Sequence, residues 1–448
     1  MQTFLIICFG QLISLVGSGL TSFALGVWAY QTTGSVTQFA LISLFIHLPN
    51  IIISPLVGAI VDRWDRRWAM ILSDSVAGIG TVAIWMLLYF NSLEIWHIYV
   101  AVGVNSIFNA FQWPAYSATI SLLVPKQHLA RANGAVQISR ATAKILSPAL
   151  AGFLVAAIQL KGILILDFAT FLVALITLLI VRFPQPNQTN KEPVKFRYLS
   201  REIFSGWNYI NLRPGLRGLL TFFTLVYFTM GILEVLFWPL MLNFSSSEQL
   251  GLVLSIGGFG WLLGSLTISA WGGPRRRISG IYLFVPLQGL LLCLGVFKTS
   301  IALAGLAVFG FLFAYPIVIS CNQTIWQTKV PPELQGRVFA LQQMVEKSAS
   351  IVAYIVTGPL VDHIFEPLLA TDGLLAGNVG QLIGTGPGRG SAFLLIIMGV
   401  INMIATFVAY QNRQIRRVEV TVREPIRSKV VAAEGISSRK LSESQAKQ

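Results

Sequence analysis

The sequence predicts an all-α polytopic membrane protein, with twelve transmembrane helices in two pseudo-symmetric six-helix bundles. Of its 448 residues, 54% are hydrophobic and 11% are charged, and the mean hydropathy is +0.70. One water-soluble core cannot bury that much apolar sequence. The apolar residues fall into runs near the roughly 20 residues that a helix needs to cross a bilayer. The two halves of the chain also match each other at a fixed offset, which indicates a duplicated six-span unit.

Apolar runs that end at charged or turn-forming residues define the predicted spans. The first runs from Phe4 to about Tyr30, which is too long for the apolar core of a signal peptide and lacks a basic start. The second and third, about 39–61 and 68–90, leave a connection too short for a domain. The twelve spans are expected to begin near residues 4, 38, 69, 96, 134, 163, 218, 250, 280, 301, 337 and 391.

The basic residues are unevenly distributed between the two sets of connections. The connections after spans 2, 4, 6, 8 and 10 and the tail hold 26 of the 32 Lys and Arg residues, whereas the opposite connections hold Lys161, Lys298 and Arg389. By the positive-inside rule, the basic connections and both termini are expected in the cytoplasm. Membrane lipids are expected partners of these charges. Nucleic-acid binding is not expected, because no single face gathers the net charge of +14.

An internal repeat supports two equivalent bundles. Residues 330–358 match residues 124–152 at an offset of 206, with Val-Pro and a following Arg at the same loop position in each half. The same offset carries Gly58 onto Gly264. The predicted organisation is therefore a six-helix bundle over 1–182, a cytoplasmic linker over 183–217, a second six-helix bundle over 218–412 and a disordered basic tail over 413–448.

The connection between the second and third spans carries a dense charge cluster. Its sequence is Gly-Ala-Ile-Val-Asp-Arg-Trp-Asp-Arg-Arg. A small residue lets two helices approach closely, and an Asp can pair with a nearby Arg or face the positive end of a helix from the other half. We expect a gate that holds the cytoplasmic side shut, built from Gly58, Asp62, Arg63, Arg66 and Arg67. The plainer alternative is a set of solvated flanking charges.

This loop pattern, G-x-x-x-D-R-x-x-R-R, resembles the loop between helices 2 and 3 of the major facilitator superfamily. Other stretches are similar to the macrolide-efflux branch of its drug:proton antiporters, namely Gly10–Ser14 with Gly17-Ser18, Phe111–Ala115, Val124-Pro125 with Leu129 and Asn133, and Gly384–Gly388. The resemblance implies the major facilitator fold and a monomer in the bacterial inner membrane that exports its substrate by alternating access, driven by protons. The chain departs from the branch at Asn105, where many members have an Arg, and at Ser147-Pro148-Ala149, a partial match to the span 5 motif.

Charged residues inside the predicted spans are candidates for coupling, because an unpaired charge in hydrocarbon costs several kcal/mol. A proton carrier must be a carboxylate whose affinity for protons changes with its surroundings. The proton-coupling candidates are Glu234, Glu346, Asp74 and Asp167. The candidates for a charge network are Arg140, Lys144 and Lys347, and the repeat relates Arg140 to Glu346. The alternative for each carboxylate is a static buried pair that fixes helix packing.

By the same resemblance, spans 1, 4, 7 and 10 line the substrate cavity. Those spans carry aromatic side chains and a few amides, a combination that suits a bulky amphiphile. Aromatic residues in membrane helices also face lipid, so the amides are the stronger candidates. The cavity candidates are Gln112, Trp113, Tyr116, Tyr227, Trp238, Asn322 and Gln323.

The leading hypothesis is a proton-coupled secondary transporter that exports a bulky amphiphilic small molecule, such as a macrolide-like drug or a secreted metabolite. The alternatives are a siderophore or peptide-metabolite exporter and a non-transporting membrane receptor or scaffold. No Walker loop indicates ATP. Neither a metal, a cofactor nor an enzyme activity is expected, because the cysteines and histidines show no paired spacing: Cys8, Cys293, Cys321, His47, His97, His128 and His363.

Overall fold

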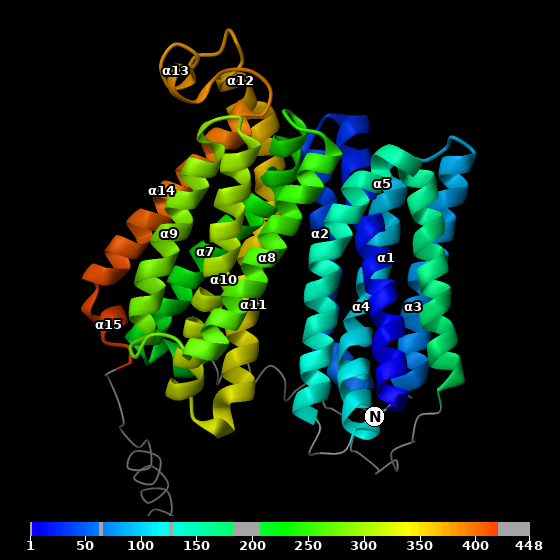
Figure 1. The fold of residues 1–448 in the computed structure, drawn as a ribbon. Coiled ribbons are helices and arrows are strands. Elements are labelled where there is room, and N and C mark those ends of the chain that lie inside the picture. Colours follow the sequence, from blue (N-terminus) through cyan, green and yellow to red (C-terminus); the bar gives the residue numbers. More distant parts are fainter. Residues whose placement is uncertain (1, 62–65, 125–128, 182–206, 420–448) are drawn as a thin grey trace, which may run out of the picture.

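Two bundles of helices lie side by side in the described part of the chain (Figure 1). The structure, a computed structural model, describes residues 2–61, 66–124, 129–181 and 207–419. The first bundle, the N half, contains α1 (Gln2–Thr33), α2 (Val36–Val61), α3 (Arg66–Tyr89), α4 (Ile95–Leu123) and α5 (Leu129–Ile180). The second bundle, the C half, contains α7 (Pro214–Leu242), α8 (Ser247–Trp271), α9 (Arg277–Phe297), α10 (Ile301–Lys329), α11 (Pro332–Leu360) and α14 (Arg389–Gln411).

The predicted number of membrane helices is confirmed. Ten described helices are long and apolar enough to cross a membrane, with α5 counted as one. α5 turns over at Gln159, whose φ of 55° and ψ of −176° are not helical, so its two limbs cross separately. Counting the two limbs of α5 separately gives eleven spans, and α4, with 29 residues, is the twelfth. Spans 5 and 6 are therefore joined by a non-helical residue instead of a loop.

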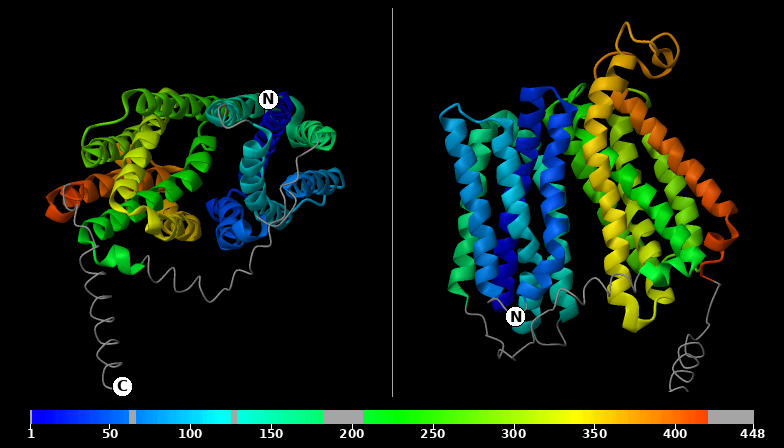
Figure 2. Two further views of the ribbon diagram at one scale, coloured as in Figure 1. Left: turned by 90° about the horizontal axis from the view of Figure 1, so that it is seen from below. Right: turned by 180° about the vertical axis from the view of Figure 1, so that it is seen from behind.

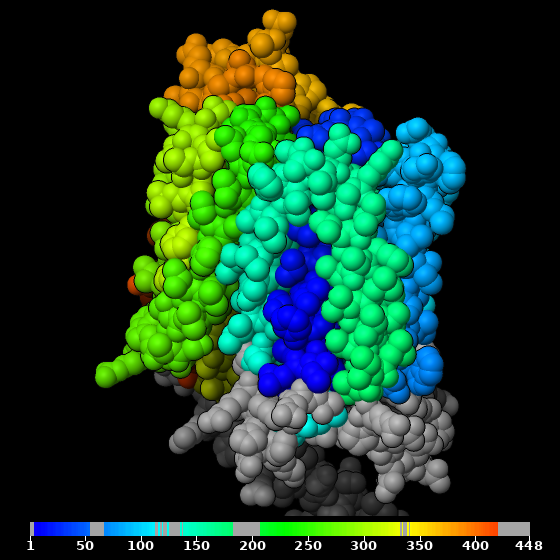
Figure 3. Space-filling view, turned by 45° about the vertical axis from the view of Figure 1, so that its right-hand side comes forward, coloured from blue at the N-terminus to red at the C-terminus, as the bar shows by residue number. Residues whose placement is uncertain are grey.

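Glycines let α1 pack between the two limbs of α5. Figure 3 shows α1 in the slot between these limbs. A side chain added at Gly19 would collide with Ser147 on the first limb, and one added at Gly10 would collide with Thr177 on the second. Small residues at such positions allow the close helix packing on which membrane bundles depend. Within the N half, α1 thus packs chiefly on the two limbs of α5.

Local signals set the ends of the C-half helices. α7 begins at Pro214, since a proline ring suits the first turn of a helix. α8 begins with a capping box between Ser246 and Gln249, and Gly272, with φ of 75°, ends it in a left-handed conformation. Ser300 caps α10. The connections between these helices are short, and the caps provide hydrogen-bond partners for backbone groups at the helix ends.

The described ends of the predicted linker and tail pack against the C half. The Tyr209 hydroxyl donates a hydrogen bond to the carbonyl of Lys329 at 2.7 Å. After α14 the chain forms α15 (Arg413–Arg416). Ile415 and Val418 are buried in the C-half core, next to the first turns of α7. The start of the predicted tail is therefore helical and docked.

Between α11 and α14 the chain leaves the bundle, at the top of Figure 1. This segment contains a π-helix, η2 (Val361–Phe365), and the short helices α12 (Glu366–Leu368) and α13 (Val379–Ile383). A glycine-rich turn then leads into α14, and a positive φ at three positions explains the choice of glycine there: Gly384, Gly386 and Gly388.

The two halves approach each other at the end where α13 lies, called here the closed end, and spread toward the opposite end (Figures 1 and 2). At the closed end α5 packs on α8 because a glycine leaves room: a side chain at Gly152 would come within 2.7 Å of the Ser247 carbonyl oxygen. Nearer the middle of α8, the Ser255 hydroxyl donates to the carbonyl of Ile145 at 2.7 Å. On the other side of the interface, α2 packs on α11.

Candidate functional site

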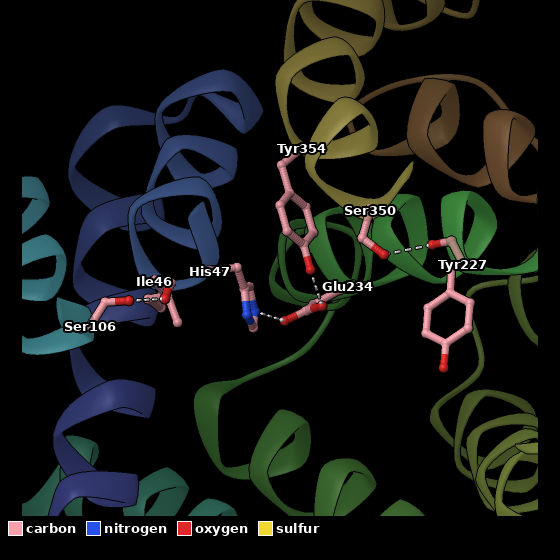
Figure 4. Close-up of polar contacts among 7 residues, drawn as sticks. All are labelled: Ile46, His47, Ser106, Tyr227, Glu234, Ser350 and Tyr354. Carbon is pink, nitrogen blue, oxygen red and sulfur yellow. Dashed lines mark hydrogen bonds and ion pairs between the residues drawn. The ribbon is translucent and has the colours of Figure 1, made fainter. Parts of the chain in front are cut away.

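An ion pair joins the two halves near the middle of the helices. Nε2 of His47, on α2, lies 3.1 Å from Oε1 of Glu234, on α7. The Tyr354 hydroxyl, on α11, donates to Oε2 of Glu234 at 2.8 Å, and its ring stacks on His47 with the centroids 5.4 Å apart. Figure 4 shows the three side chains converging from both halves. The side chains of His47 and Glu234 are each 41% exposed, so water and protons can reach the pair.

Hydrogen bonds next to the ion pair fix the helices that carry it. In the N half, the Ser106 hydroxyl on α4 donates to the carbonyl of Ile46 at 2.5 Å. In the C half, the Ser350 hydroxyl on α11 donates to the carbonyl of Tyr227 at 2.9 Å (Figure 4). Each partner of the ion pair is thus held firmly within its own half. A movement of the halves relative to each other therefore changes the length of the ion pair.

Asp74 lies in a cluster of amides inside the N half. Nε2 of Gln11 lies 3.0 Å from one carboxylate oxygen, and Nε2 of Gln112 lies 2.5 Å from the other. Gln112 also donates to the Gln11 side-chain oxygen at 3.3 Å. The structure thus brings a predicted coupling residue and a predicted cavity residue into one buried cluster that ties α1, α3 and α4 together.

Asp167 is buried among hydroxyl groups of the same half. It accepts hydrogen bonds from Thr81 on α3 at 2.9 Å and from Ser18 on α1 at 3.5 Å. Both donors are neutral.

Among the described residues, no group of three His, Cys, Asp or Glu residues could hold a metal ion.

Glu346 is 2% exposed and lies inside the C half. Its Oε1 accepts from Nδ2 of Asn322 at 3.3 Å and from Nε2 of Gln342 at 3.1 Å. The Asn322 side-chain oxygen accepts in turn from the Trp326 indole at 3.1 Å. Of the four predicted coupling carboxylates, Glu234 is thus the one whose ion-pair partner belongs to the other half.

The three predicted network cations occupy exposed positions. Nζ of Lys144, on α5, lies 4.1 Å from the ring centroid of Trp261, on α8 of the other half. The Trp261 ring packs on Tyr315, with the centroids 5.0 Å apart. Arg140 precedes Lys144 by one turn on the same face of α5, and Lys347 lies on α11.

The predicted gate loop is described in part. Gly58 lies in the last turn of α2 and Arg66 begins α3, whereas Asp62 and Arg63 lie outside the described residues. Arg67 donates from Nε and Nη2 to two carbonyl oxygens at the end of α5, at 3.1 and 2.7 Å. A cation is favourable at the C-terminal end of a helix, where carbonyl groups lack partners. Arg67 therefore ties the start of α3 to the end of α5.

Trp238 packs in the interface between the two halves, near the closed end. It lies on α7, and its ring packs against two aromatic rings of the N half: Phe23 on α1 at 5.1 Å and Phe39 on α2 at 6.0 Å. A side chain at Gly26 would lie 3.3 Å from the indole, so this glycine makes room for it. This predicted cavity residue thus joins three helices of the two halves.

The other aromatic cavity candidates have different surroundings. Tyr116 is buried in a core cluster of the N half. The Tyr227 ring is partly buried and lies apart from the His47–Glu234 pair (Figure 4). Trp113 belongs to α4, and Gln323 is a partly buried residue of α10.

A second carboxylate of the C half reaches into the N half. Asp362, in η2, accepts hydrogen bonds from the backbone N–H groups of Val36 at 3.2 Å and of Thr37 at 2.9 Å. It also accepts from the hydroxyls of Ser35 at 2.9 Å and of Thr37 at 2.7 Å. These groups begin α2, where N–H groups lack helical partners. Asp362 therefore caps a helix of the opposite bundle.

One residue of this interface, His47, is not predicted as a site residue by the sequence, whereas Asp362 is recognisable as an ionisable residue close to the end of a predicted span. A lone histidine fits no metal or catalytic spacing, but an ionisable residue inside a span is itself a signal. For Asp362 the signal is a repeated spacing, because Gly358-Pro-Leu-Val-Asp362 shares the Gly-x-x-x-Asp pattern that begins at Gly58. Neither signal reveals the partner, which lies 187 positions from His47 and 325 positions from Asp362.

Comparison with known proteins gives a family match over most of the chain. The family model described as Major Facilitator Superfamily matches residues 7–354. Macrolide efflux protein A of Streptococcus pyogenes is 27% identical over 366 residues, which are 79% of this chain and 88% of that protein. The enterobactin exporter EntS of Shigella flexneri is 24% identical over 411 residues, which are 90% of this chain and 92% of that protein.

Solved structures share the fold. The nucleoside transporter NupG superposes with a TM-score of 0.70 at 14% identity, covering 92% of this chain and 100% of its own. A bacterial homolog of the lysosomal transporter Spinster, in an inward-facing and unoccupied conformation, gives a TM-score of 0.66 at 16% identity, covering 93% of this chain and 98% of its own.

Proposed function

Because the chain belongs to the Major Facilitator Superfamily, we propose that it exports a bulky amphiphilic small molecule in exchange for protons, by alternating access of a central site to the two faces of the membrane. Relatives named as a macrolide efflux protein and an enterobactin exporter support the direction of transport. The ion pair between His47 and Glu234 carries the proposal of coupling, since a proton that binds Glu234 removes an attraction between the halves.

We place both termini and the spread end of the bundle in the cytoplasm. The support is the distribution of basic residues, 26 of 32 of which lie in the connections on that side and in the tail. In this orientation the closed end faces the outside. The described conformation is then the one that loads substrate from the cytoplasm.

Coupling follows from the charge of Glu234. In the loading conformation the ionised carboxylate attracts His47 and holds α7 close to α2. When the closed end opens to a more acidic outside, a proton binds Glu234 and removes its negative charge. The ion pair can form again after that proton has left toward the cytoplasm, so a proton moves inward while substrate moves outward. The proton gradient thereby biases the exchange between the two conformations.

The loop from Gly58 to Arg67 is the proposed gate at the opposite end. Its support is the sequence pattern, in which Asp62 can face the start of a helix from the C half. The bonds of Arg67 to the end of α5 support it further, because they anchor the end of the loop in the N half. The moving bodies in this proposal are 1–182 and 218–412 of a monomer in the bacterial inner membrane, joined by the linker 183–217.

Uptake into inverted membrane vesicles tests the proposal. A panel of fluorescent amphiphiles is offered under an imposed inward-acid gradient to the wild type and to Glu234→Gln. The variant is expected to lose gradient-driven uptake by about tenfold or more while still binding the compound. Asp372→Asn is the matched control, because Asp372 is an exposed carboxylate between α12 and α13. Equal uptake by the wild type and Glu234→Gln would rule out coupling through Glu234.

A siderophore-like metabolite is a second candidate substrate. It is favoured by the enterobactin exporter among the relatives and by the basic residues on α5. If no compound moves in the wild type, a specific metabolite exporter or a non-transporting receptor or scaffold becomes the better hypothesis.

A further inference from the structure

Lys144 lies at the edge of the contact between α5 of the N half and α8 of the C half. Its side chain is exposed, and its ammonium group lies 4.1 Å from the ring centroid of Trp261 on the opposite half. The next residue, Ile145, accepts the hydrogen bond from Ser255 that joins α5 to α8. Lys144 therefore belongs to the rim of this contact.

Among the described residues, no carboxylate lies within ion-pair distance of the Lys144 ammonium group. Arg140, one turn earlier on the same face, and Glu234 act on it electrostatically. Both oxygens of Glu234 already bind other groups, His47 and Tyr354. In the described part of the chain the ion pair found within 4.0 Å is that of His47 with Glu234, so Lys144 has no acidic partner there.

The remaining carboxylates of the spans do not offset this positive charge at the surface. Asp74, Asp167 and Glu346 are all buried and bound by neutral amides or hydroxyls. A cation at membrane depth is costly, and such residues mark substrate paths by default. The exposed surface at the rim is therefore basic.

We infer that the transported molecule carries an anionic group that binds Lys144, with a planar apolar body packed against Trp261 and Tyr315. The inference rests on the proposed function and narrows its substrate class to aromatic organic anions. The two rings lie 5.0 Å apart at the centroids and offer a surface for such a body. The positive charge of Arg140 on the same face adds attraction for the anion.

Binding of two matched dyes tests the inference without any gradient. The wild type in phosphatidylcholine nanodiscs is titrated with anilinonaphthalene sulfonate, an anion, and with phenylnaphthylamine, its neutral counterpart, and protein-free nanodiscs are subtracted. Lys144→Gln is expected to weaken binding of the sulfonate about tenfold and to leave the neutral dye within about twofold. Lys144→Arg is expected to keep the affinity for the sulfonate.

Lys161→Gln is the control, because Lys161 also lies over an aromatic ring, with Nζ 5.9 Å from the Tyr89 centroid. It is expected to bind both dyes as the wild type does. If Lys144→Gln weakens both dyes equally, or neither, the inference is wrong. Because binding needs no proton gradient, this result is independent of whether transport is proton-coupled.

An anionic lipid headgroup could occupy the same position as a soluble anion. The titration is therefore repeated with phosphatidylglycerol in the nanodiscs. Competition with the sulfonate dye in the wild type, absent in Lys144→Gln, would assign the site to lipid and overturn the substrate assignment. Unchanged affinity in the presence of phosphatidylglycerol supports a soluble anion.

Discussion

Asp362 binds both the backbone N–H and the hydroxyl of Thr37, at 2.9 and 2.7 Å, across the interface between the halves. The carboxylate lies just after α11, and Thr37 lies in the first turn of α2. A negative charge at the start of a helix is favourable because the unpaired N–H groups and the helix dipole are positive there. The closed end is thus stabilised by a cap that one half supplies to the other.

Weakening this cap should open the closed end. Asp362→Asn removes the charge, and we expect a loss of about 1 kcal/mol, or about a fivefold fall in the ratio of closed to open molecules. Spin labels at Ser92 and Thr299, both in exposed connections at the closed end, report this ratio through their distance distribution, once the three native cysteines have been replaced. Asp372→Asn is the control and is expected to leave the distribution unchanged. A distribution unchanged in Asp362→Asn would show that the cap does not hold the halves together.

The close approach of α11 to α2 depends on a glycine. A side chain at Gly358 would collide with Cα of Thr37 and lie 2.9 Å from its backbone nitrogen, and neither backbone atom can move aside. Gly358→Ala is therefore expected to shift the same labels to longer distances. Gly80→Ala is the control, because nothing lies within 4 Å of a side chain there. In that helix interior, alanine should stabilise the protein slightly, by about 1 kcal/mol or less. Equal effects of the two substitutions would contradict the role of Gly358.

His47 should help to hold the two halves together. Its Nε2 lies 3.1 Å from Oε1 of Glu234, and its ring stacks on Tyr354 across the interface. His47→Gln removes the stacked ring, so the closed population should fall by about fivefold. The spin-label distances are the measurement. His97→Gln, at a partly exposed position near the start of α4, serves as the control.

Asp167 is expected to support packing. Asp167→Asn keeps a carbonyl acceptor, and the hydroxyls of Thr81 and Ser18 can rotate, so we expect export within about twofold of the wild type. Asp167→Ala leaves these hydroxyls without their acceptor and should lower the unfolding free energy by about 1–3 kcal/mol. Thermal unfolding in detergent and vesicle uptake measure the two effects. An Asp167→Asn protein of normal thermal stability without gradient-driven uptake would place the proton step at Asp167.

The spans could be predicted because hydropathy is a property of neighbouring residues. Glu234 is predicted for the same reason, as an acid inside an apolar run. Its partner His47 could not be predicted, because the meeting of α2 with α7 depends on how the two bundles dock. The sequence places a connection at Lys161, between spans that begin near 134 and 163, but it does not show that one non-helical residue, Gln159, makes this connection.

The amides show a second limit of the sequence. An amide inside a membrane protein must be satisfied by a water-filled cavity or by a buried polar partner. The sequence predicts Gln112 and Asn322 as cavity residues but does not predict their partners: in the structure they donate to Asp74 and Glu346 within their own halves. These partners depend on distances between helices, which local sequence does not encode.

The connection at Gln159 bears on how the chain enters the membrane during synthesis. Because the two limbs of α5 are joined without a polar loop, little besides the charge of Lys161 has to cross the bilayer between them. The limbs can therefore insert together as a helical hairpin. The slot that receives α1 forms once both limbs are in place, so a nascent chain that ends before Ile180 leaves its first helix without a complete partner.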